Sequence, residues 1–274
     1  MLGLLERSIA SIERRLTLLA PPEGATKMFG SVTRDAVRRD RLLHEMQRLR
    51  GAAYLEDGAI RREDLASDGR HRTPEDKTSW HLLMTNAEHE ITACVWYREH
   101  HRAASIDQLR MRDCPLRRDA SLRDLVTRAV EHDMAQARLE SLRYVEVGGW
   151  AVSKQTRGAV EGLILALGAY SLGRLFGGAL GLTTATVRHC SSTILRRLGG
   201  SPFEIDGAAV PPYYDPRYDC MMELLRFDSR RPNSRYAAVV EQLEAKLRNV
   251  AVFVDPAAAV ETRRALTTVA EAAA

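Results

Sequence analysis

The sequence predicts a mixed α/β fold in which helices flank one central sheet. Two short β-rich runs, SWHLLMT (79–85) and EITACVWYR (90–98), are separated only by NAEH, which is typical of a β-hairpin. A strand–helix–strand–helix order follows over residues 144–198. Two strands that are joined by a crossover helix pair in parallel. A hairpin followed by such a unit therefore predicts a sheet with both antiparallel and parallel pairs.

The chain before the hairpin is expected to be helical. An amphipathic helix is predicted ahead of APPEGA (20–25), because apolar residues recur there at spacings of three and four. These residues are Leu5, Ile9, Ile12, Leu16 and Leu19. A second helix is predicted over 35–55, and the polar stretch 61–78 predicts a loop. We therefore assign residues 1–60 to an N-terminal helical extension.

After the hairpin, helices and strands are predicted to alternate. The predicted strands cover 144–152, 179–186, 201–205 and 220–228, and the predicted helices cover 118–139, a segment that begins near Thr156, 187–200 and 234–250. Residues 61–250 are assigned to the core domain. The alanine-rich segment 251–274 is expected to be a flexible tail.

Composition indicates a globular protein without a nucleic-acid partner. Of 274 residues, 45% are hydrophobic and 28% charged. The formal charge is +4, but acids are interleaved with the basic residues, so the concentrated basic stripe of a nucleic-acid binder is missing from the sequence. A mild basic excess suits an acidic partner.

Cysteine spacing and the N-terminus predict a cytoplasmic protein without a metal site. The cysteines lie far apart and form no CxxC pair, at Cys94, Cys114, Cys190 and Cys220. Free thiols are typical of the reducing cytoplasm. Glu6 and Arg7 come too early for the apolar core of a signal peptide.

One apolar segment, Leu163–Leu182, approaches the length that spans a bilayer. Glycines interrupt its second half, so we interpret it as a buried helix, a glycine turn and a buried strand. No membrane span is predicted, and peripheral membrane contact is left open.

The stretch VEVGGWAVSKQTRGAVEG (145–162) is unusual for a core strand. Gly148 and Gly149 cost conformational entropy and offer no side chain to pack. A strand that kinks at a bulge and exposes its backbone to a ligand has a use for them. Arg157 follows at the start of a predicted helix, where free N–H groups and an arginine together favour a phosphate. The alternative is a glycine strand packed under a helix, with a solvent-exposed arginine.

Five motifs in this order resemble a known family. They are RGAAY with Arg50 and Tyr54, EDK around Asp76, Arg98 at the end of ACVWYR, EVGGWAVSKQTR, and PPYYDPRYDCMMELLRFDS. Over about Arg41–Asp228 the chain resembles the GCN5-related N-acetyltransferase (GNAT) fold. The resemblance is to its acyl-homoserine-lactone synthases, long-chain N-acyl amino acid synthases and exosortase-associated acyltransferases.

The chain departs from the family pattern at two places. In the phosphate loop, RGAVEG, only Arg157 and Gly162 match. Leu195 stands where many GNAT enzymes carry a tyrosine acid. His189 and Tyr214 are therefore considered as proton donors to the leaving thiol, although a structural role is commoner for a histidine.

The resemblance implies a GNAT-like mixed sheet and an N-acyltransferase. A long fatty acyl group would pass from acyl carrier protein, or from acyl-CoA, directly to the α-amine of an amino acid or similar small amine. It implies no tightly bound cofactor, only the donor's phosphopantetheine, and acyl carrier protein as partner. The alternatives are a lactone-type autoinducer synthase and a non-catalytic module that senses an acyl ligand or serves as a scaffold.

Roles for individual residues follow from the same resemblance and from the needs of acyl transfer: proton removal, oxyanion stabilisation and positioning. The catalytic set is Glu146, Gly149 and Trp150; the donor-binding set is Gly148, Val152, Arg157 and Gly158; the acceptor-binding set is Arg50, Tyr54, Asp76 and Arg98. For the acyl chain we expect an apolar pocket at Leu163, Leu167 and Tyr170, where the alternative is ordinary core.

Overall fold

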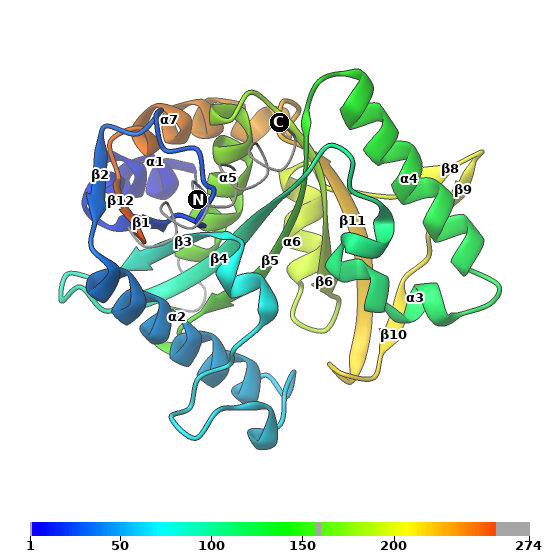
Figure 1. Cartoon of the computed structure of the whole chain (residues 1–274), viewed down its shortest axis with the longest axis horizontal. Coiled ribbons are helices and arrows are strands. Elements are labelled where there is room, and N and C mark those ends of the chain that lie inside the picture. The colour runs from blue at the N-terminus through cyan, green and yellow to red at the C-terminus, as the bar shows by residue number, and fades with distance from the viewer. Residues whose placement is uncertain (1, 157–159, 256–274) are drawn as a thin grey trace, which may run out of the picture.

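One large sheet dominates the computed structural model, which describes residues 2–156 and 160–255 (Figure 1). Within these residues the sheet has ten strands. In spatial order the main path is β10 (Tyr213–Asp215), β11 (Cys220–Asp228), β6 (Ala179–Thr186), β5 (Arg143–Val152), β4 (Ile91–His100), β3 (Trp80–Thr85), β1 (Leu16–Leu19), β12 (Ala251–Val254) and β2 (Ser31–Arg34). Off this path, β7 (Ser201–Pro202) pairs with β11, and β8 (Glu204–Ile205) and β9 (Ala208–Ala209) form a separate two-stranded sheet. The predicted mixture is confirmed, because β3–β4 is antiparallel and β5–β6 is parallel.

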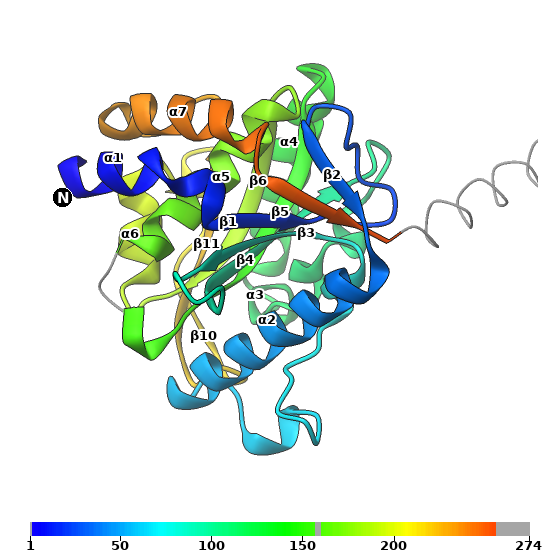
Figure 2. The same cartoon turned by 90° about the vertical axis from the view of Figure 1, so that its left-hand side faces the viewer.

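Helices cover both faces of the sheet (Figure 2). The helices are α1 (Leu2–Ala10), α2 (Ala36–Glu56), α3 (Pro115–Arg118), α4 (Arg123–Leu139), α5 (Glu161–Leu175), α6 (Ser191–Leu198) and α7 (Ala237–Leu247). One core cluster joins α1, α5 and α7 to one face, and two further clusters join α2 and α4 to the other. The sheet therefore lies between two helical layers.

The N-terminal prediction is wrong in part. The helix expected up to Leu19 ends at Ala10, and Leu16–Leu19 form β1 between β3 and β12. Leu16, Leu18 and Leu19 are at most 2% exposed, so the strand is covered on both faces and lacks the alternation that marks a strand in sequence. The strand β12 at Ala251–Val254 belongs to the same sheet, although a tail was expected from 251. The predicted domain boundaries after residues 60 and 250 therefore separate strands that belong to one sheet.

Most other predicted elements are found, but β2, β9 and β10 were not predicted, and the helix expected to begin near Thr156 begins at Glu161. The apolar segment forms α5, a turn at Gly177 and Gly178 with positive φ, and β6. Among the described residues no helix is both long and apolar enough to cross a bilayer. In the same part of the chain no group of three or more His, Cys, Asp or Glu side chains could hold a metal ion. The expected tail beyond Asp255 lies outside the described residues.

Candidate active site

The glycine pair of β5 lies in a β-bulge. Cys94 of β4 is opposite Ala151, but Trp96 is opposite Gly148. Two residues of β5, Gly149 and Trp150, therefore face the single residue between Cys94 and Trp96. Gly149 has φ +64°, which a residue with a side chain adopts only at a cost. The predicted bulge is confirmed.

The indole of Trp96 explains why both positions are glycine. A Cβ on Gly149 would lie 2.2 Å from Trp96 Cδ1, and one on Gly148 would lie 2.5 Å from Trp96 Cζ2. The ring thus packs directly against the glycine backbone, where no side chain fits. The guanidinium carbon of Arg110 lies 5.9 Å from the centroid of the same ring.

The strands β5 and β6 separate just before this bulge. Their parallel pairing runs from Arg143–Ala179 to Glu146–Leu182 and stops there. Beyond Leu182, β6 still pairs with β11 on its other side as far as Thr186. A cavity of about 140 Å³ opens where β5 leaves β6.

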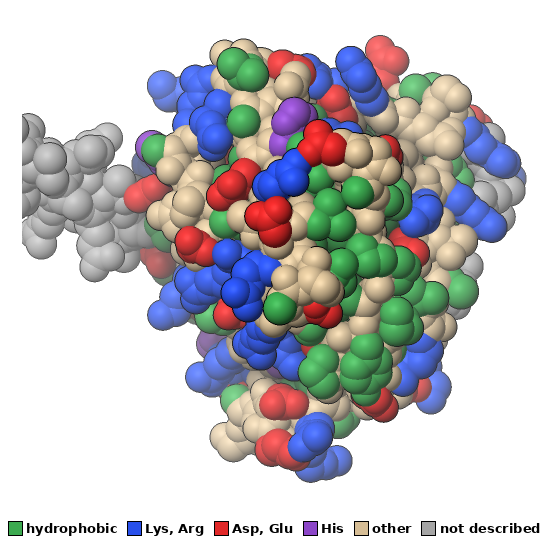
Figure 3. Space-filling view, turned by 90° about the vertical axis from the view of Figure 1, so that its right-hand side faces the viewer, with side chains coloured by type: hydrophobic (Ala, Val, Ile, Leu, Met, Phe, Trp, Pro, Cys, Tyr) green, Lys and Arg blue, Asp and Glu red, His purple; other side chains and the backbone are tan. Residues whose placement is uncertain are grey.

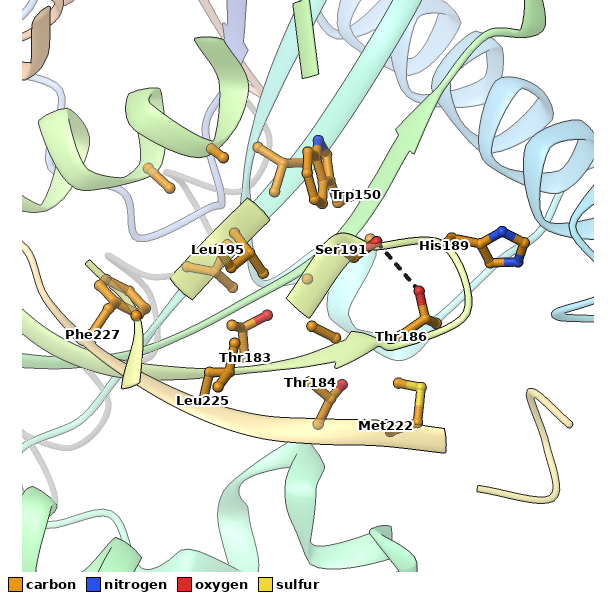
Figure 4. Close-up of a pocket in the computed structure, with 18 of the residues that line it drawn as sticks. Trp150, Thr183, Thr184, Thr186, His189, Ser191, Leu195, Met222, Leu225 and Phe227 are labelled. Atoms are coloured by element: carbon orange, nitrogen blue, oxygen red, sulfur yellow. Dashed lines mark hydrogen bonds between the residues drawn. The ribbon is translucent and has the colours of Figure 1, made fainter. Parts of the chain in front are cut away.

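Residues from both faces of the sheet line this cavity. From the α5 side come Ala166, Ala169, Tyr170, Leu195 and Phe227, and from the side of α2 and α4 come Tyr54, Asp57, Arg110 and Tyr218. Figure 4 shows Trp150 opposite the β6 and β11 residues, with Leu195 of α6 between them. The cavity therefore passes between the strands, with an apolar side under α5 and a polar side under α2.

The floor of the cavity is polar along β6. Thr183, Thr184 and Thr186 line it, and Thr186 Oγ1 lies 3.3 Å from Ser191 Oγ, at the start of α6 (Figure 4). Across the cavity, Trp150 Nε1 is buried and has no hydrogen-bond partner among the described residues. The β6 side thus presents threonine hydroxyls to a narrow space, whereas Trp150 Nε1 points away from β6 (Figure 4).

A smaller cavity of about 30 Å³ adjoins the first. The two share the lining residues Arg110, Val147, Thr183, Thr184 and Tyr218. This set, which we call the junction, lies where β5 and β6 part. The smaller cavity is also lined by Glu146, Trp96 and Asp215, which do not line the larger one.

Glu146 is buried and held by three donors. The backbone N–H groups of Arg110 and Met111 donate to it at 2.8 and 3.1 Å, and His100 Nε2 lies 2.9 Å from Oε2. These bonds tie β5 to the short 3-10 turn Arg110–Asp113, so the carboxylate fixes the position of Arg110.

Arg110 in turn contacts Tyr218. Its Nη2 donates to the Tyr218 hydroxyl at 3.3 Å, and its Nε lies 3.6 Å from Glu75 Oε1. Tyr218 lies between β10 and β11, where its backbone N–H donates to Asp215 O and its carbonyl accepts from Arg188. A cation and a phenol therefore meet at the junction, each anchored through its backbone.

The predicted acceptor residues separate into two groups. Arg50 and Asp76 form a bidentate ion pair with both N–O distances at 2.8 Å, and they are 1% and 2% exposed. Gln47 and Thr73 also donate to Asp76, and this contact with Arg50 holds the pKa of Asp76 below its usual range against the opposing effect of burial. Tyr54 does line the larger cavity, and burial together with the nearby Tyr218 raises its pKa. Arg50 and Asp76 thus support the wall that carries Tyr54.

The remaining predicted residues are placed as follows. Arg98 of β4 lies opposite Glu146 of β5 in the strand register. Val152 packs against Gly162 at the start of α5. Arg157 and Gly158 lie outside the described residues, so their phosphate-binding role stays a prediction.

The acyl pocket expected on α5 needs a correction. Tyr170 lines the cavity and its ring centroid lies 5.3 Å from that of Phe227. Leu163 and Leu167 do not line it and pack in the core instead, while Ala166 and Ala169 face the cavity. The helix is apolar on nearly every side, so its sequence does not show which face borders a cavity.

The two proton donors considered from the sequence lie at the outside of the site. His189 is exposed at the cavity rim. Tyr214 is 52% exposed, donates to Asp219 and does not line the cavity. It lies opposite Met221 in the β10–β11 pair, and Met221 and Val187 are exposed as well. Hydrophobic side chains gather on the face that is seen from the side of α4 and β10 (Figure 3).

Sequence reasoning missed Arg110 and Tyr218. Tyr218 stands inside the motif PPYYDPRYDC, which carried the resemblance, and its neighbour Tyr214 was chosen instead. Arg110 lies in a turn without periodicity, so only the bond to Glu146 reveals its place.

Comparison with known proteins identifies the fold. The sequence matches no protein-family model, and a search of curated proteins also finds no match. The structure of BjaI, a CoA-dependent acyl-homoserine lactone synthase, with SAM and isopentyl-CoA is similar with a TM-score of 0.52 at 13% identity, over 88% of this chain and 93% of that chain. The same enzyme with MTA gives 0.51 at 12% identity over 88% and 93%. FeeM, an N-acyl amino acid synthase from uncultured soil microbes, gives 0.45 at 12% identity over 72% and 93%. The chain therefore has the fold of acyl-homoserine lactone synthases, which confirms the predicted GNAT-like fold class.

Proposed function

We propose that the protein is an N-acyltransferase that moves an acyl group from a pantetheine thioester to a small amine. One observation carries the proposal: β5 and β6 part at a glycine bulge, and a cavity joins an apolar side to a polar side at that point. Direct transfer needs a place where a thioester and an amine are held together.

The pantetheine arm would lie between the separated strands. Along Thr183–Thr186 the edge of β6 that faces β5 has no strand partner among the described residues. Backbone groups at such an edge bind an extended ligand as an added strand would. The arm carries amides, whose donors and acceptors fit this edge.

The acyl group would enter the apolar side. A cavity of about 150 Å³ lined by apolar residues takes up a benzene molecule. The whole cavity here has about 140 Å³ and its apolar side is only part of it, so that side suits a short buried acyl portion of at most about six carbon atoms. The long acyl chain predicted from the sequence needs a larger cavity, and the contacting rings of Tyr170 and Phe227 would block it. Rates with acyl donors of two to sixteen carbons, measured on Tyr170→Ala and on the parent protein, test this limit: the variant should favour longer chains.

The acceptor would approach from the polar side, past Tyr54 and Arg110. The α-amine of an amino acid or a similar small amine remains the proposed acceptor class. Glu146, proposed from the sequence as a proton relay, is better suited to position Arg110, because three donors already hold its carboxylate.

Acyl carrier protein remains the proposed donor, with acyl-CoA as the second candidate. Both carry the same phosphopantetheine arm. The formal charge of +4 favours an acidic carrier.

The test is a product assay. The purified protein receives hexanoyl-CoA or hexanoyl carrier protein with a mixture of amino acids, and in parallel S-adenosylmethionine. Mass spectrometry and thiol titration should find one amide per thiol released. A lactone from S-adenosylmethionine would favour the autoinducer synthase, and no product with any donor would contradict the proposal.

A further inference from the structure

Acyl transfer leaves a thiolate that needs a proton, and the position used for this by many GNAT enzymes holds Leu195. This side chain lines the cavity and has no proton to give. His189 is exposed at the rim and Tyr214 lies outside the cavity. A second place to look for the acid is the junction, where β5 and β6 part.

The geometry points to Tyr218 as the acid that protonates the leaving thiolate, an inference that rests on the proposed acyl transfer. Tyr218 is half-buried and belongs to the junction, where β5 and β6 part and where the thioester would lie. A tyrosine from the turn between β10 and β11 thus replaces one from α6.

Other groups at the junction are less suited to this step. Threonine hydroxyls are much weaker acids than a phenol, and arginine keeps its proton. Tyr54 also lines the larger cavity, but burial raises its pKa, which disfavours proton release. Tyr218 alone among the junction side chains combines a phenol with a cation that touches it, Arg110 Nη2 at 3.3 Å.

Arg110 would stabilise the phenolate that forms when the proton leaves. A preorganised donor aimed at developing charge accelerates a reaction because it needs no rearrangement at that moment. The preorganisation is visible in the backbone: Glu146 holds the N–H of Arg110, and Asp215 and Arg188 hold the backbone of Tyr218.

The step balances in atoms and electrons. The neutral amine attacks the thioester carbonyl and a C–N bond forms. The C–S bond then breaks, and sulfur keeps the electron pair and takes the phenol proton of Tyr218. The phenolate recovers a proton from the nitrogen that becomes the amide. The products are one amide and one free thiol.

The experiment compares two leaving groups. Tyr218→Phe should lower kcat by about 10²–10³-fold with a hexanoyl-CoA donor. With an acidic aryl thiol as leaving group, whose thiolate needs no proton, the loss should shrink to less than about tenfold. The matched control is Tyr214→Phe, a phenol in the same hairpin outside the cavity, and it should keep the parent rate with both donors.

The outcomes separate this inference from the proposed function. If the parent protein forms no amide, the proposed function fails and the role of Tyr218 fails with it. If the parent is active but Tyr218→Phe keeps the full rate, or loses the same factor with both leaving groups, only the role of Tyr218 is overturned. Circular dichroism and donor KM, unchanged in the variant, show that the fold and the donor site remain.

Discussion

Two arginines on the same side of the sheet differ in how completely their guanidinium groups are bound. Arg50 is 1% exposed and makes a bidentate pair with Asp76 plus a bond to the His71 carbonyl. The Arg110 side chain is 32% exposed, touches Tyr218 and lies 3.6 Å from Glu75. A buried bidentate ion pair such as Arg50–Asp76 holds the fold in place, whereas a partly exposed cation at a cavity can still act on a ligand.

The comparison corrects the weight given to sequence motifs. RGAAY and EDK pointed to Arg50 and Asp76, and the structure places both in a buried pair behind Tyr54. Their substitution should affect stability first, and substitution of Arg110 should affect turnover first.

The largest expected change is a loss of unfolding free energy when Arg50 is replaced. Arg50→Met leaves the Asp76 carboxylate buried without its cation, which typically costs about 3–5 kcal/mol. Urea unfolding measures the change in free energy, and the double variant with Asp76→Leu should recover part of it, because the unpaired charge is gone. A loss of activity with unchanged stability would place Arg50 with the ligand instead.

Gly149→Ala should be the next most damaging change. The new Cβ would meet Trp96 Cδ1 at 2.2 Å, and the φ of +64° disfavours a side chain. Together we expect about 2–4 kcal/mol of destabilisation. Gly177→Ala is the control, because its φ is also positive but no atom of the described residues lies within 4 Å of the added Cβ. Equal losses at both glycines would mean that backbone strain, and not the Trp96 contact, explains the bulge glycine.

Acid should destabilise the fold around the Arg50–Asp76 pair, because His81 contacts Asp76 and must take up a proton. This side chain is 1% exposed, its Nε2 lies 2.9 Å from Asp76 O, and burial lowers its pKa to about 4. The unfolded chain, with a pKa near 6.5, binds the proton more readily between these values. The contribution of His81 to the free energy of unfolding should therefore not change with pH above about pH 6.5. As the pH is lowered from 6.5 to 4, this contribution should lower the free energy of unfolding by about 2–3 kcal/mol. His81→Gln should flatten this slope in a pH series of urea unfolding, and an unchanged slope would exclude His81 as its source.

The smallest expected effect is a loss of turnover without a loss of stability when Arg110 is replaced. Arg110→Lys keeps the charge near Glu75 but loses the planar group that reaches Tyr218. We expect kcat to fall about tenfold, which corresponds to about 1.4 kcal/mol, while the free energy of unfolding stays within about 0.5 kcal/mol. Arg50→Lys is the matched control and should show the reverse pattern. Two variants with the same pattern would remove the distinction between the arginines.

Much of the fold could be predicted because its patterns are local. The hairpin of β3 and β4 follows from two β-rich runs around a short polar turn, and the parallel β5–β6 pair follows from the helix between them. The strands β1 and β12 could not be found in this way. Both are short and lie inside a broad sheet, and their pairing depends on contacts between the two ends of the chain.

The site was predictable where backbone chemistry decided it. Gly148 and Gly149 indicated a bulge, but the reason for two glycines, the Trp96 ring, comes from a neighbouring strand. Arg110 and Tyr218 meet only because the turn after β4 and the turn before β11 converge on the parting strands. Such convergence leaves no period or spacing in the sequence.

The central claim is that the donor lies between β5 and β6, and hydrogen–deuterium exchange tests it most directly. A non-reactive hexanoyl-pantetheine analogue, with CH₂ in place of sulfur, is added to the intact protein at saturation. We predict slower exchange in peptides that cover Val147–Val152 and Thr183–Thr186, and unchanged exchange in β1 and β12. Protection elsewhere with none in these two strands would contradict the claim.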